Sequence, residues 1–321
     1  MISHQDLLEA VPNALKAVDL SSFGTPISGK VRNMIVRDDG SRILVTTDRV
    51  SAFDVVLGAI PFKGQVLNQL SGWWFDHVRD IVPNHVIAMP DENVLIGREA
   101  QPLPVEVIVR GFITGVTKTS LWTLYANGDR HPYGIPLPDD LEKNDALPIP
   151  IITPTTKAEA GGHDERLTRE EILDSGLIAP QLWAQIADVA VRLFTRGQEV
   201  ARAAGLVLVD TKYEFGLIDG KLVVIDEIHT PDSSRYWTLS SYEKNPRAPE
   251  NFDKEFLREW FNAQGYSGDG PIPAMPPEFV AQVAARYIAA YEQLTGLEFK
   301  PGSQPAPERI QTNLEKYFNQ P

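Results

Sequence analysis

The chain has 321 residues, with 43 acidic and 30 basic side chains, so its formal net charge is −13. It contains no cysteine, which excludes disulfides, thiolate nucleophiles, iron–sulfur clusters and cysteine-ligated zinc sites. A hydrophobic fraction of 43% excludes an intrinsically disordered chain, and no apolar run approaches the roughly 18 residues of a membrane span. The negative charge disfavours general nucleic-acid binding. The N-terminus lacks the basic and apolar regions of a secretory signal, so we expect a cytoplasmic enzyme or ligand-binding protein.

The first third of the sequence is predicted to be rich in β-strands. Alternating apolar residues at Val31–Val36 and Ile43–Thr47 flank Asp38–Ser41, which has the composition of a hairpin turn. Further strands are expected at Val86–Met89 and Val105–Ile113, the second of which is rich in β-branched residues.

A proline-containing segment, Gln101–Pro104, precedes the last of these strands. Proline fixes the backbone angle φ and breaks regular structure, so the segment predicts a boundary between two lobes. We expect an N-terminal β-rich lobe of residues 1–104 and a larger α+β lobe of residues 105–321 that ends in helices.

Helices are expected to predominate after a proline-rich loop at Tyr133–Thr156. Helical apolar spacing begins at Pro180 and ends at Gly205, and further helices are predicted at Asp253–Phe261, with Asp253 as the cap, and at Glu278–Leu294. The order of elements is not an alternation of strands and helices, which disfavours a doubly wound dinucleotide fold. Neither common glycine-rich phosphate motif is present.

The densest group of charges follows the apolar run Leu206–Val209. On a strand, the side chains of Asp210, Lys212 and Glu214 share one face, because side chains alternate between faces. A purely structural interpretation is a solvated edge or a ladder of salt bridges. The alternative is a catalytic face.

A return strand, Leu222–Asp226, brings more carboxylates opposite that face. A two-residue loop at Asp219-Gly220 pairs Glu214 with Ile225, whereas a longer loop or a bulge pairs Glu214 with Asp226. In either register, carboxylates converge around one lysine. Oxygen ligands of this kind suit Mg²⁺ carried in with a nucleotide phosphate.

A second group combines hydroxyls, a lysine and acidic residues between Thr155 and Glu165. Such a loop can present backbone N–H groups and hydroxyls to an anion. The bland alternative is a helix-capping loop, since Thr168 and Glu171 form a capping-box pattern just beyond it.

Two weaker signals involve single basic residues. Arg110 ends an apolar strand, where its planar guanidinium suits phosphate or carboxylate, or where its stem lets it reach water. Lys30 follows Gly29 just before a hairpin, which is one of several settings that include a nucleotide-phosphate loop.

Several long motifs occur together and in order. They are GKVRNM from Gly29, TDRVSAFDVVL from Thr47, PLPVEVIVRGFITG from Pro102, TPTTKAEAGGHDE from Thr153, VLVDTKYEFG from Val207 and DEIHTPDSSRYW from Asp226. In these motifs the chain resembles the SAICAR synthetase family, and in particular its longer, yeast-like branch. The resemblance extends over roughly Gly29 to Leu294.

The resemblance implies a fold and an activity. The fold is two-lobed and α+β, with a kinase-like N-terminal β lobe and the nucleotide in the cleft. The activity is an ATP-dependent ligation that joins the carboxylate of CAIR, a phosphoribosyl aminoimidazole carboxylate, to the amino group of L-aspartate. The products are SAICAR, ADP and phosphate, by way of an acyl phosphate. The implied cofactors are ATP and Mg²⁺, and no nucleic-acid, membrane or protein partner is implied.

The resemblance also assigns roles to individual residues. The catalytic residues are Lys212 and Asp210. The ATP-binding residues are Gly29, Lys30, Arg32, Leu103, Val105, Glu106 and Glu214, with the hinge around Leu103 gripping adenine mainly through its backbone. The substrate-binding residues are Arg110, Thr155, Lys157, His163, Asp164, Asp232, Ser234 and Arg235. The metal-binding residues are Asp226 and Glu214.

One position departs from the family pattern. The motif that ends at Gly115 usually continues with a serine that contacts the phosphoribosyl end of the substrate, but Val116 follows here. The role of that serine therefore does not transfer, and Thr114, Thr117 and Thr119 are alternatives.

Two other classes use part of the same residue set. A kinase-like small-molecule phosphotransferase needs Lys30, Lys212 and Asp226 but no L-aspartate. A non-catalytic nucleotide-binding protein needs the hinge but not Lys212 or Arg235.

Overall fold

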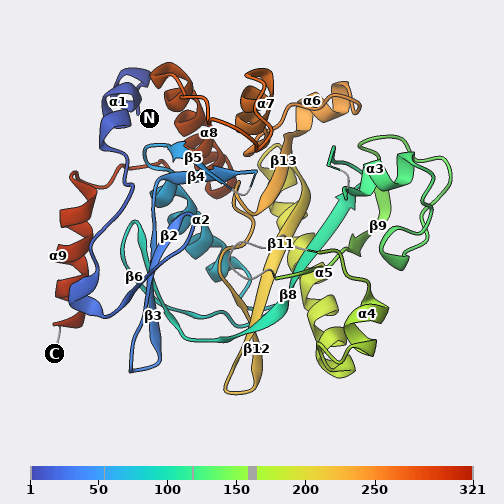
Figure 1. Cartoon of the computed structure of the whole chain (residues 1–321), viewed down its shortest axis with the longest axis horizontal. Helices are drawn as coiled ribbons and strands as arrows, with labels where there is room; N and C mark the ends of the chain where they lie inside the picture. Colours follow the sequence, from blue (N-terminus) through green and yellow to red (C-terminus); the bar gives the residue numbers. More distant parts are fainter. Residues whose placement is uncertain (1, 54, 118, 158–164, 320–321) are drawn as a thin grey trace.

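In the described residues, two large antiparallel sheets, a separate two-stranded hairpin and the helices around them form the protein (Figure 1). The structure is a computed structural model that describes residues 2–53, 55–117, 119–157 and 165–319. Together the sheets and helices make an α+β fold, as predicted.

The first sheet contains the predicted N-terminal hairpin. Its strands, in spatial order, are β1 (Pro26–Ser28), β2 (Arg32–Val36), β3 (Ser41–Thr46), β7 (Val94–Arg98) and β6 (Val86–Asp91). Side chains alternate between its faces: Ile35 and Ile43 are buried in an apolar cluster on one face, whereas Met34 and Leu44 line a cavity on the other. Directly after β3 in the sequence, β4 (Arg49–Ala52) and β5 (Val55–Ala59) form a separate two-stranded hairpin.

The second sheet is built around two long strands. Its main path is β10 (Thr155–Thr156), β8 (Gln101–Phe112), β11 (Leu206–Ile218) and β12 (Lys221–Ile225), with β9 (Ala146–Ile152) paired to β8 and β13 (Ser234–Thr238) paired to β11. Ile218 pairs with Lys221, so the loop between β11 and β12 has two residues, and Glu214 pairs with Ile225. The structure therefore has the first of the two predicted registers.

Helices cover both sheets. The α-helices are α1 (His4–Ala10), α2 (Lys63–His77), α3 (Leu121–Ala126), α4 (Arg169–Asp174), α5 (Pro180–Ala203), α6 (Leu239–Lys244), α7 (Glu255–Ala263), α8 (Pro277–Thr295) and α9 (Ala306–Phe318), and short 3₁₀ turns are η1 (Val11–Asn13), η2 (Ser21–Phe23) and η3 (Pro132–Gly134). The long helix α5 packs against β11, and α8 packs against α1 and α2. The C-terminal helix α9 returns to the first sheet, where Ile310 and Leu314 join the cluster that contains Ile35 (Figure 1).

The two sheets share one core. A large apolar cluster contains Leu44 and Leu95 of the first sheet together with Val107 and Tyr213 of the second. The switch from one sheet to the other falls between Arg98 and Gln101. The predicted lobe boundary at residue 104 falls inside β8, and a division of the chain there stays a prediction.

Three local predictions were wrong. Gln101–Pro104 forms the start of β8 and does not interrupt regular structure. The register between β8 and β11 shifts opposite these residues, and the resulting bulge accommodates proline. The predicted loop at Tyr133–Thr156 contains β9 and β10. Pro148 lies in β9 and is exposed, and proline is compatible with a strand at the edge of a sheet. Asp253 does not cap α7, which begins at Glu255 after Lys254 and has no side-chain cap.

The helices predicted from apolar spacing are confirmed in α5 and α8, and Gly296 ends α8 in the left-handed conformation. Thr168 and Glu171 form the predicted capping box of α4. In the described part of the chain, no helix is long and apolar enough to cross a membrane.

Candidate active site

One face of the second sheet carries a continuous set of charges. Asp210 pairs directly with Arg110 of β8 and with Arg235 of β13, while Glu214 pairs with Glu106 of β8. Directly opposed residues of antiparallel strands lie on the same face, so the predicted charged face of β11 extends over three strands. The other face carries Val107, Val109 and Tyr213, which are completely buried.

Lys212 lies at the centre of this charged face. Its Nζ is 2.5 Å from Glu106 Oε1 and 3.0 Å from Glu214 Oε1, and Glu214 also pairs with Lys157. Burial by itself raises the pKa of Glu214, but the two lysines outweigh it and lower the pKa to about 2. Burial likewise opposes the charged form of Lys212, but Glu214 and Glu106 raise its pKa. Both groups are therefore charged at neutral pH. The ladder of salt bridges, predicted as the purely structural alternative, is present.

A second cluster lies two residues earlier on β11. Asp210 Oδ2 accepts hydrogen bonds from Arg110 Nη1 at 2.7 Å and from Arg235 Nη1 at 2.9 Å. Arg110 also donates through Nε to the hydroxyl of Thr153 at 2.8 Å. The two guanidinium groups are thereby held together by one carboxylate, with side chains 16% and 22% exposed. Such a pair can bind a multiply charged anion.

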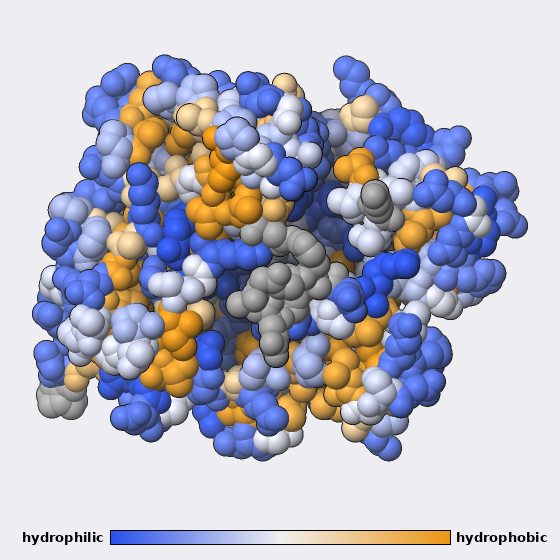
Figure 2. All heavy atoms as spheres, in the orientation of Figure 1, coloured by the Kyte–Doolittle hydropathy of each residue, from blue (hydrophilic) through white to orange (hydrophobic). Residues whose placement is uncertain are grey.

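A cavity of about 580 Å³ lies between the first sheet and the charged face of the second. Several predicted nucleotide or substrate residues line it: Gly29, Lys30, Arg32, Lys157, Glu214 and Asp226. Its remaining wall includes His85 and the segment from Arg98 through Ala100 to Pro102, where the chain passes between the sheets. Figure 2 shows hydrophilic side chains in the recesses near the middle of the face it displays.

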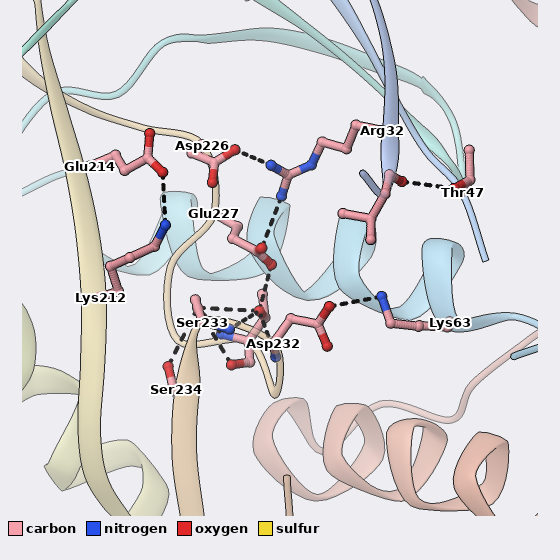
Figure 3. A network of polar contacts seen from close by, with 12 residues as sticks. Arg32, Thr47, Lys63, Lys212, Glu214, Asp226, Glu227, Asp232, Ser233 and Ser234 are labelled. Atoms are coloured by element: carbon pink, nitrogen blue, oxygen red, sulfur yellow. Dashed lines mark hydrogen bonds and ion pairs between the residues drawn. The ribbon is translucent and has the colours of Figure 1, made fainter. Parts of the chain in front are cut away.

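Arg32 joins the two sheets across this cavity. It lies at the start of β2, and its guanidinium pairs with Asp226 through Nη1 and with Glu227 through Nη2, the latter at 3.1 Å (Figure 3). Asp226 follows the last residue of β12 and has a φ of 69°, in the left-handed region that non-glycine residues seldom occupy. Such a conformation costs about 1 kcal/mol or more and marks a position that the surrounding structure holds in place.

The segment that follows is anchored in the interior. Asp232 pairs with Lys63 at 2.8 Å and with Lys254 at 3.5 Å, and it accepts a hydrogen bond from the Tyr287 hydroxyl at 2.6 Å. Lys63 is completely buried at the first turn of α2, and the Asp232 side chain is 6% exposed. Burial disfavours the charged form of Asp232, but Lys254 and Lys63 lower its pKa well below the usual range.

Glu227 and Ser234 belong to the same polar network. Glu227 accepts a hydrogen bond of 2.5 Å from the Thr230 hydroxyl, and Ser234 shares one of 2.7 Å with Thr211 inside the protein. Asp232 and Ser234, predicted to bind substrate, therefore already have protein partners. Figure 3 shows the contacts that run from Arg32 through Glu227 to the turn that carries Asp232, which pairs with Lys63 of α2.

The other predicted site residues fall in different places. The side chains of Leu103 and Val105 are buried in the shared core, and their contact with adenine through the backbone stays a prediction. The carbonyl oxygen of Pro104 accepts a hydrogen bond from the Lys157 N–H. Thr155 has a buried hydroxyl without a hydrogen-bond partner in the described part of the chain. His163 and Asp164 lie outside the described residues.

Carboxylates near Asp226 are the candidate ligands for a metal ion. In the described ranges of the chain, no group of three or more His, Cys, Asp or Glu side chains could hold a metal by itself. Asp226 and Glu227 nevertheless present two carboxylates to one point. Mg²⁺ is usually held by one or two protein carboxylates together with substrate phosphates and water, so the residues present fit a nucleotide-borne Mg²⁺.

Sequence reasoning missed Lys63 and Lys254 and gave Glu227 no role. Lys63 lies in Ile60-Pro61-Phe62-Lys63-Gly64, where an isolated lysine in an apolar stretch is the only signal. Its partner Asp232 is 169 residues further along the chain.

An α+β fold with a charged cavity between two sheets, next to paired arginines, defines a class of enzymes that bring together a nucleotide and a second anionic substrate. The family model described as SAICAR synthetase matches residues 25–272. The chain therefore belongs to the SAICAR synthetase family, whose members are ATP-dependent ligases of purine biosynthesis.

Individual relatives agree with this assignment. The phosphoribosylaminoimidazole-succinocarboxamide synthase of Legionella pneumophila (strain Lens) is 48% identical over 304 residues, which cover 92% of this chain and 96% of the relative. The chloroplastic enzyme of the same name from Arabidopsis thaliana is 46% identical, with coverage of 98% and 75%. The SAICAR synthase of Saccharomyces cerevisiae, solved in complex with SAICAR, has a TM-score of 0.79 and 31% identity, and the match covers 90% of this chain and all of that one.

Proposed function

We propose that this chain joins the carboxylate of CAIR to the amino group of L-aspartate, with conversion of ATP to ADP and phosphate. The observation that carries the proposal is the position of Lys212. It lies on one sheet face between the cavity residue Glu214 and the arginine pair around Asp210. A phosphoryl group transferred from a nucleotide in the cavity would pass Lys212 to reach a substrate held by Arg110 and Arg235.

The nucleotide is assigned to the cavity. Lys30 and the backbone of Gly29 face it from the first sheet, and Arg32 is placed to contact phosphates from the same side. The chain segment around Pro102 supplies the wall where adenine is expected, and Glu214, on the neighbouring strand of the same sheet, is assigned to a ribose or a metal. Phosphoryl transfer depends mainly on positioning and on neutralising charge, and these residues supply both.

Chemistry at the carboxylate explains the need for ATP. Oxide is too poor a leaving group for direct attack by an amine. A carboxylate oxygen of CAIR attacks the γ-phosphorus and ADP leaves, which gives an acyl phosphate. The amine of L-aspartate then attacks the acyl carbon, phosphate leaves with the bridging oxygen, and the amide nitrogen loses a proton. Lys212 stabilises the charge that develops on the transferred group.

Arg110 and Arg235 are assigned to the phosphate and carboxylate of CAIR. Both are charged donors whose geometry is fixed by Asp210, so they need little reorganisation when the substrate arrives. The related Saccharomyces cerevisiae structure contains SAICAR, the product expected here. Asp210 first orients the two arginines, and its predicted role as acceptor of the ammonium proton stays a prediction.

Mg²⁺ is assigned to Asp226, with Glu227 as its neighbour. When bound, the ion would neutralise charge on the nucleotide phosphates. The roles of Thr155, Lys157, His163 and Asp164 near CAIR or L-aspartate stay predictions, as does a cytoplasmic location. Asp232 and Ser234 are reassigned as residues that hold the site together, because their partners lie inside the protein.

The test is ADP release from ATP and Mg²⁺ with CAIR and L-aspartate added singly and together. The proposal predicts that continuous ADP release, beyond a single turnover, needs both substrates, with SAICAR formed in equal amount. A phosphotransferase would release ADP continuously with CAIR alone, and a nucleotide-binding protein would release none. Either result would overturn the proposal.

A further inference from the structure

Two consecutive carboxylates converge on one guanidinium at the margin of the cavity. Asp226 and Glu227 each contribute one oxygen, to Nη1 and Nη2 of Arg32 respectively (Figure 3). Neighbouring side chains of an extended strand point to opposite faces, so this convergence needs a break in the strand. The left-handed backbone of Asp226 supplies that break.

The same contact links the two sheets. Arg32 begins β2 of the first sheet, whereas Asp226 and Glu227 follow β12 of the second, 194 residues further along the chain. The side chains are between 11% and 23% exposed, and Arg32 and Asp226 both line the cavity. The link therefore lies where a small ion that enters the cavity can reach it.

Arg32 neutralises the two carboxylates that the proposed function assigns to a divalent cation. One guanidinium or one hydrated divalent cation can neutralise these carboxylates, because each brings positive charge to two converging carboxylate oxygens. They cannot occupy the same space. What sets Arg32 apart from the other cavity-wall pair Arg42–Glu99 is that its one guanidinium bridges two carboxylates.

We propose that Arg32 is a latch that holds Asp226 and Glu227 in the nucleotide-free protein and is displaced by the divalent cation that arrives with the nucleotide. The inference rests on the assignment of the cation to Asp226. It makes cation binding and release of β2 from the 226–227 turn a single coupled event, and it makes Arg32 a competitor of the cation for the same two carboxylates.

The test measures Mn²⁺ binding to the nucleotide-free protein, by the electron paramagnetic resonance signal of free Mn²⁺ during titration. Arg32→Met removes the competing charge while keeping a long side chain. We expect it to bind Mn²⁺ at least about tenfold more tightly than the unmodified protein, since a close positive charge is lost from two carboxylates. In Arg32→Met/Asp226→Asn the gain should disappear.

Arg42→Met is the matched control. Arg42 also lines the cavity, and among the described residues it pairs with a single carboxylate, Glu99, at 2.5 and 2.6 Å. Its loss should leave Mn²⁺ affinity unchanged. If Arg32→Met does not fold, Arg32→Lys replaces it. A single ammonium cannot span both carboxylates, so this variant should bind Mn²⁺ severalfold more tightly.

A folded Arg32 variant that binds Mn²⁺ no more tightly than the unmodified protein overturns the latch, and so does an equal gain in Arg42→Met. The measurement needs neither CAIR nor L-aspartate nor turnover. If Mn²⁺ affinity does not rise but ADP release needs both substrates, the latch is wrong and the proposed function stands. If Mn²⁺ affinity rises but ADP release does not need both substrates, the latch stands and the proposed function is wrong.

Discussion

The two ends of the 226–235 segment hold their charges in opposite ways. At the cavity end, the side chains of Arg32 and Asp226 are 16% and 23% exposed. At the interior end, Lys63 is completely buried against Asp232, which is 6% exposed. Ion pairs at a cavity wall can exchange partners with a ligand, whereas a buried pair cannot be separated without leaving a charge out of water.

The difference assigns separate tasks to one short segment. In the proposed latch, the cavity end supplies groups that change partners when the cation binds, and the interior end fixes where those groups lie. Variants at the interior end should therefore change stability first, and variants at the cavity end should change turnover first.

The largest effect is expected at Lys63. Lys63→Met leaves the Asp232 carboxylate buried with Lys254 as its one remaining cationic partner among the described residues, and breaking a buried pair costs about 3–5 kcal/mol. The free energy of unfolding from urea titration should fall by about 3 kcal/mol. Lys16→Met, at an exposed position, is the control and should change little.

The double variant Lys63→Met/Asp232→Asn sharpens this prediction. It removes both charges of the pair, so its loss of stability should be smaller than the sum of the two single losses. Additive losses, or a Lys63→Met protein as stable as the unmodified one, would mean that the interior pair is not an anchor.

At the charged face of the second sheet, Lys212→Met should lower turnover at least about a hundredfold, because it removes the cation that the proposed function places beside the transferred phosphoryl group. The fold should be retained, as judged by circular dichroism and thermal unfolding. Lys221→Met, an exposed lysine at the start of β12, should keep normal turnover. Turnover near normal in the Lys212 variant would remove Lys212 from the chemistry.

The interior of the 226–235 segment should also make the protein sensitive to acid. Burial lowers the pKa of His229 to about 3, and an unfolded histidine titrates near 6.5. Between these values the unfolded state binds the extra proton, so stability is lost as the pH falls from about 6.5 towards 3. This residue alone contributes a loss of about 2 kcal/mol at pH 5.

His229→Gln should flatten that part of the curve of unfolding free energy against pH, even if it lowers stability at neutral pH. The exposed His131→Gln variant should keep the original slope. An unchanged slope in the His229 variant would show that another group causes the sensitivity to acid.

The smallest effect is expected at Arg235. Arg235→Ala removes one of two guanidinium groups bound to Asp210, and a charged hydrogen bond is worth about 1.5–3 kcal/mol. The KM for CAIR should rise at least about tenfold, with a much smaller change in the KM for ATP. The opposite pattern would take Arg235 out of the CAIR site. Arg192→Ala, on the exposed face of α5, is the control.

Periodicity predicted much of the fold. The strands at β2 and β3, the helices α5 and α8 and the shared face of Asp210, Lys212 and Glu214 all follow from alternation or helical spacing within one segment. The positions of β9 and of the first residues of β8, which both contain proline, did not follow from the sequence. They are set by pairing with strands elsewhere in the chain.

The candidate site was predictable to the extent that its residues lie in contiguous motifs. Glu214, Asp226, Lys30 and Arg32 were identified and do line one cavity. Lys63 was missed because a buried lysine is identified only by its partner, and that partner comes from a different part of the sequence. The choice between the two β11–β12 registers likewise depended on the backbone at Asp219, whose φ of 52° permits the two-residue loop.

The most direct test of the account follows the oxygen atoms of the CAIR carboxylate. When both carboxylate oxygens are labelled with ¹⁸O and the reaction is run with ATP, Mg²⁺ and L-aspartate, the account predicts that the released phosphate carries one ¹⁸O atom for each SAICAR formed. That transfer occurs only if an oxygen of the CAIR carboxylate itself accepts the phosphoryl group. Released phosphate without ¹⁸O would contradict the account.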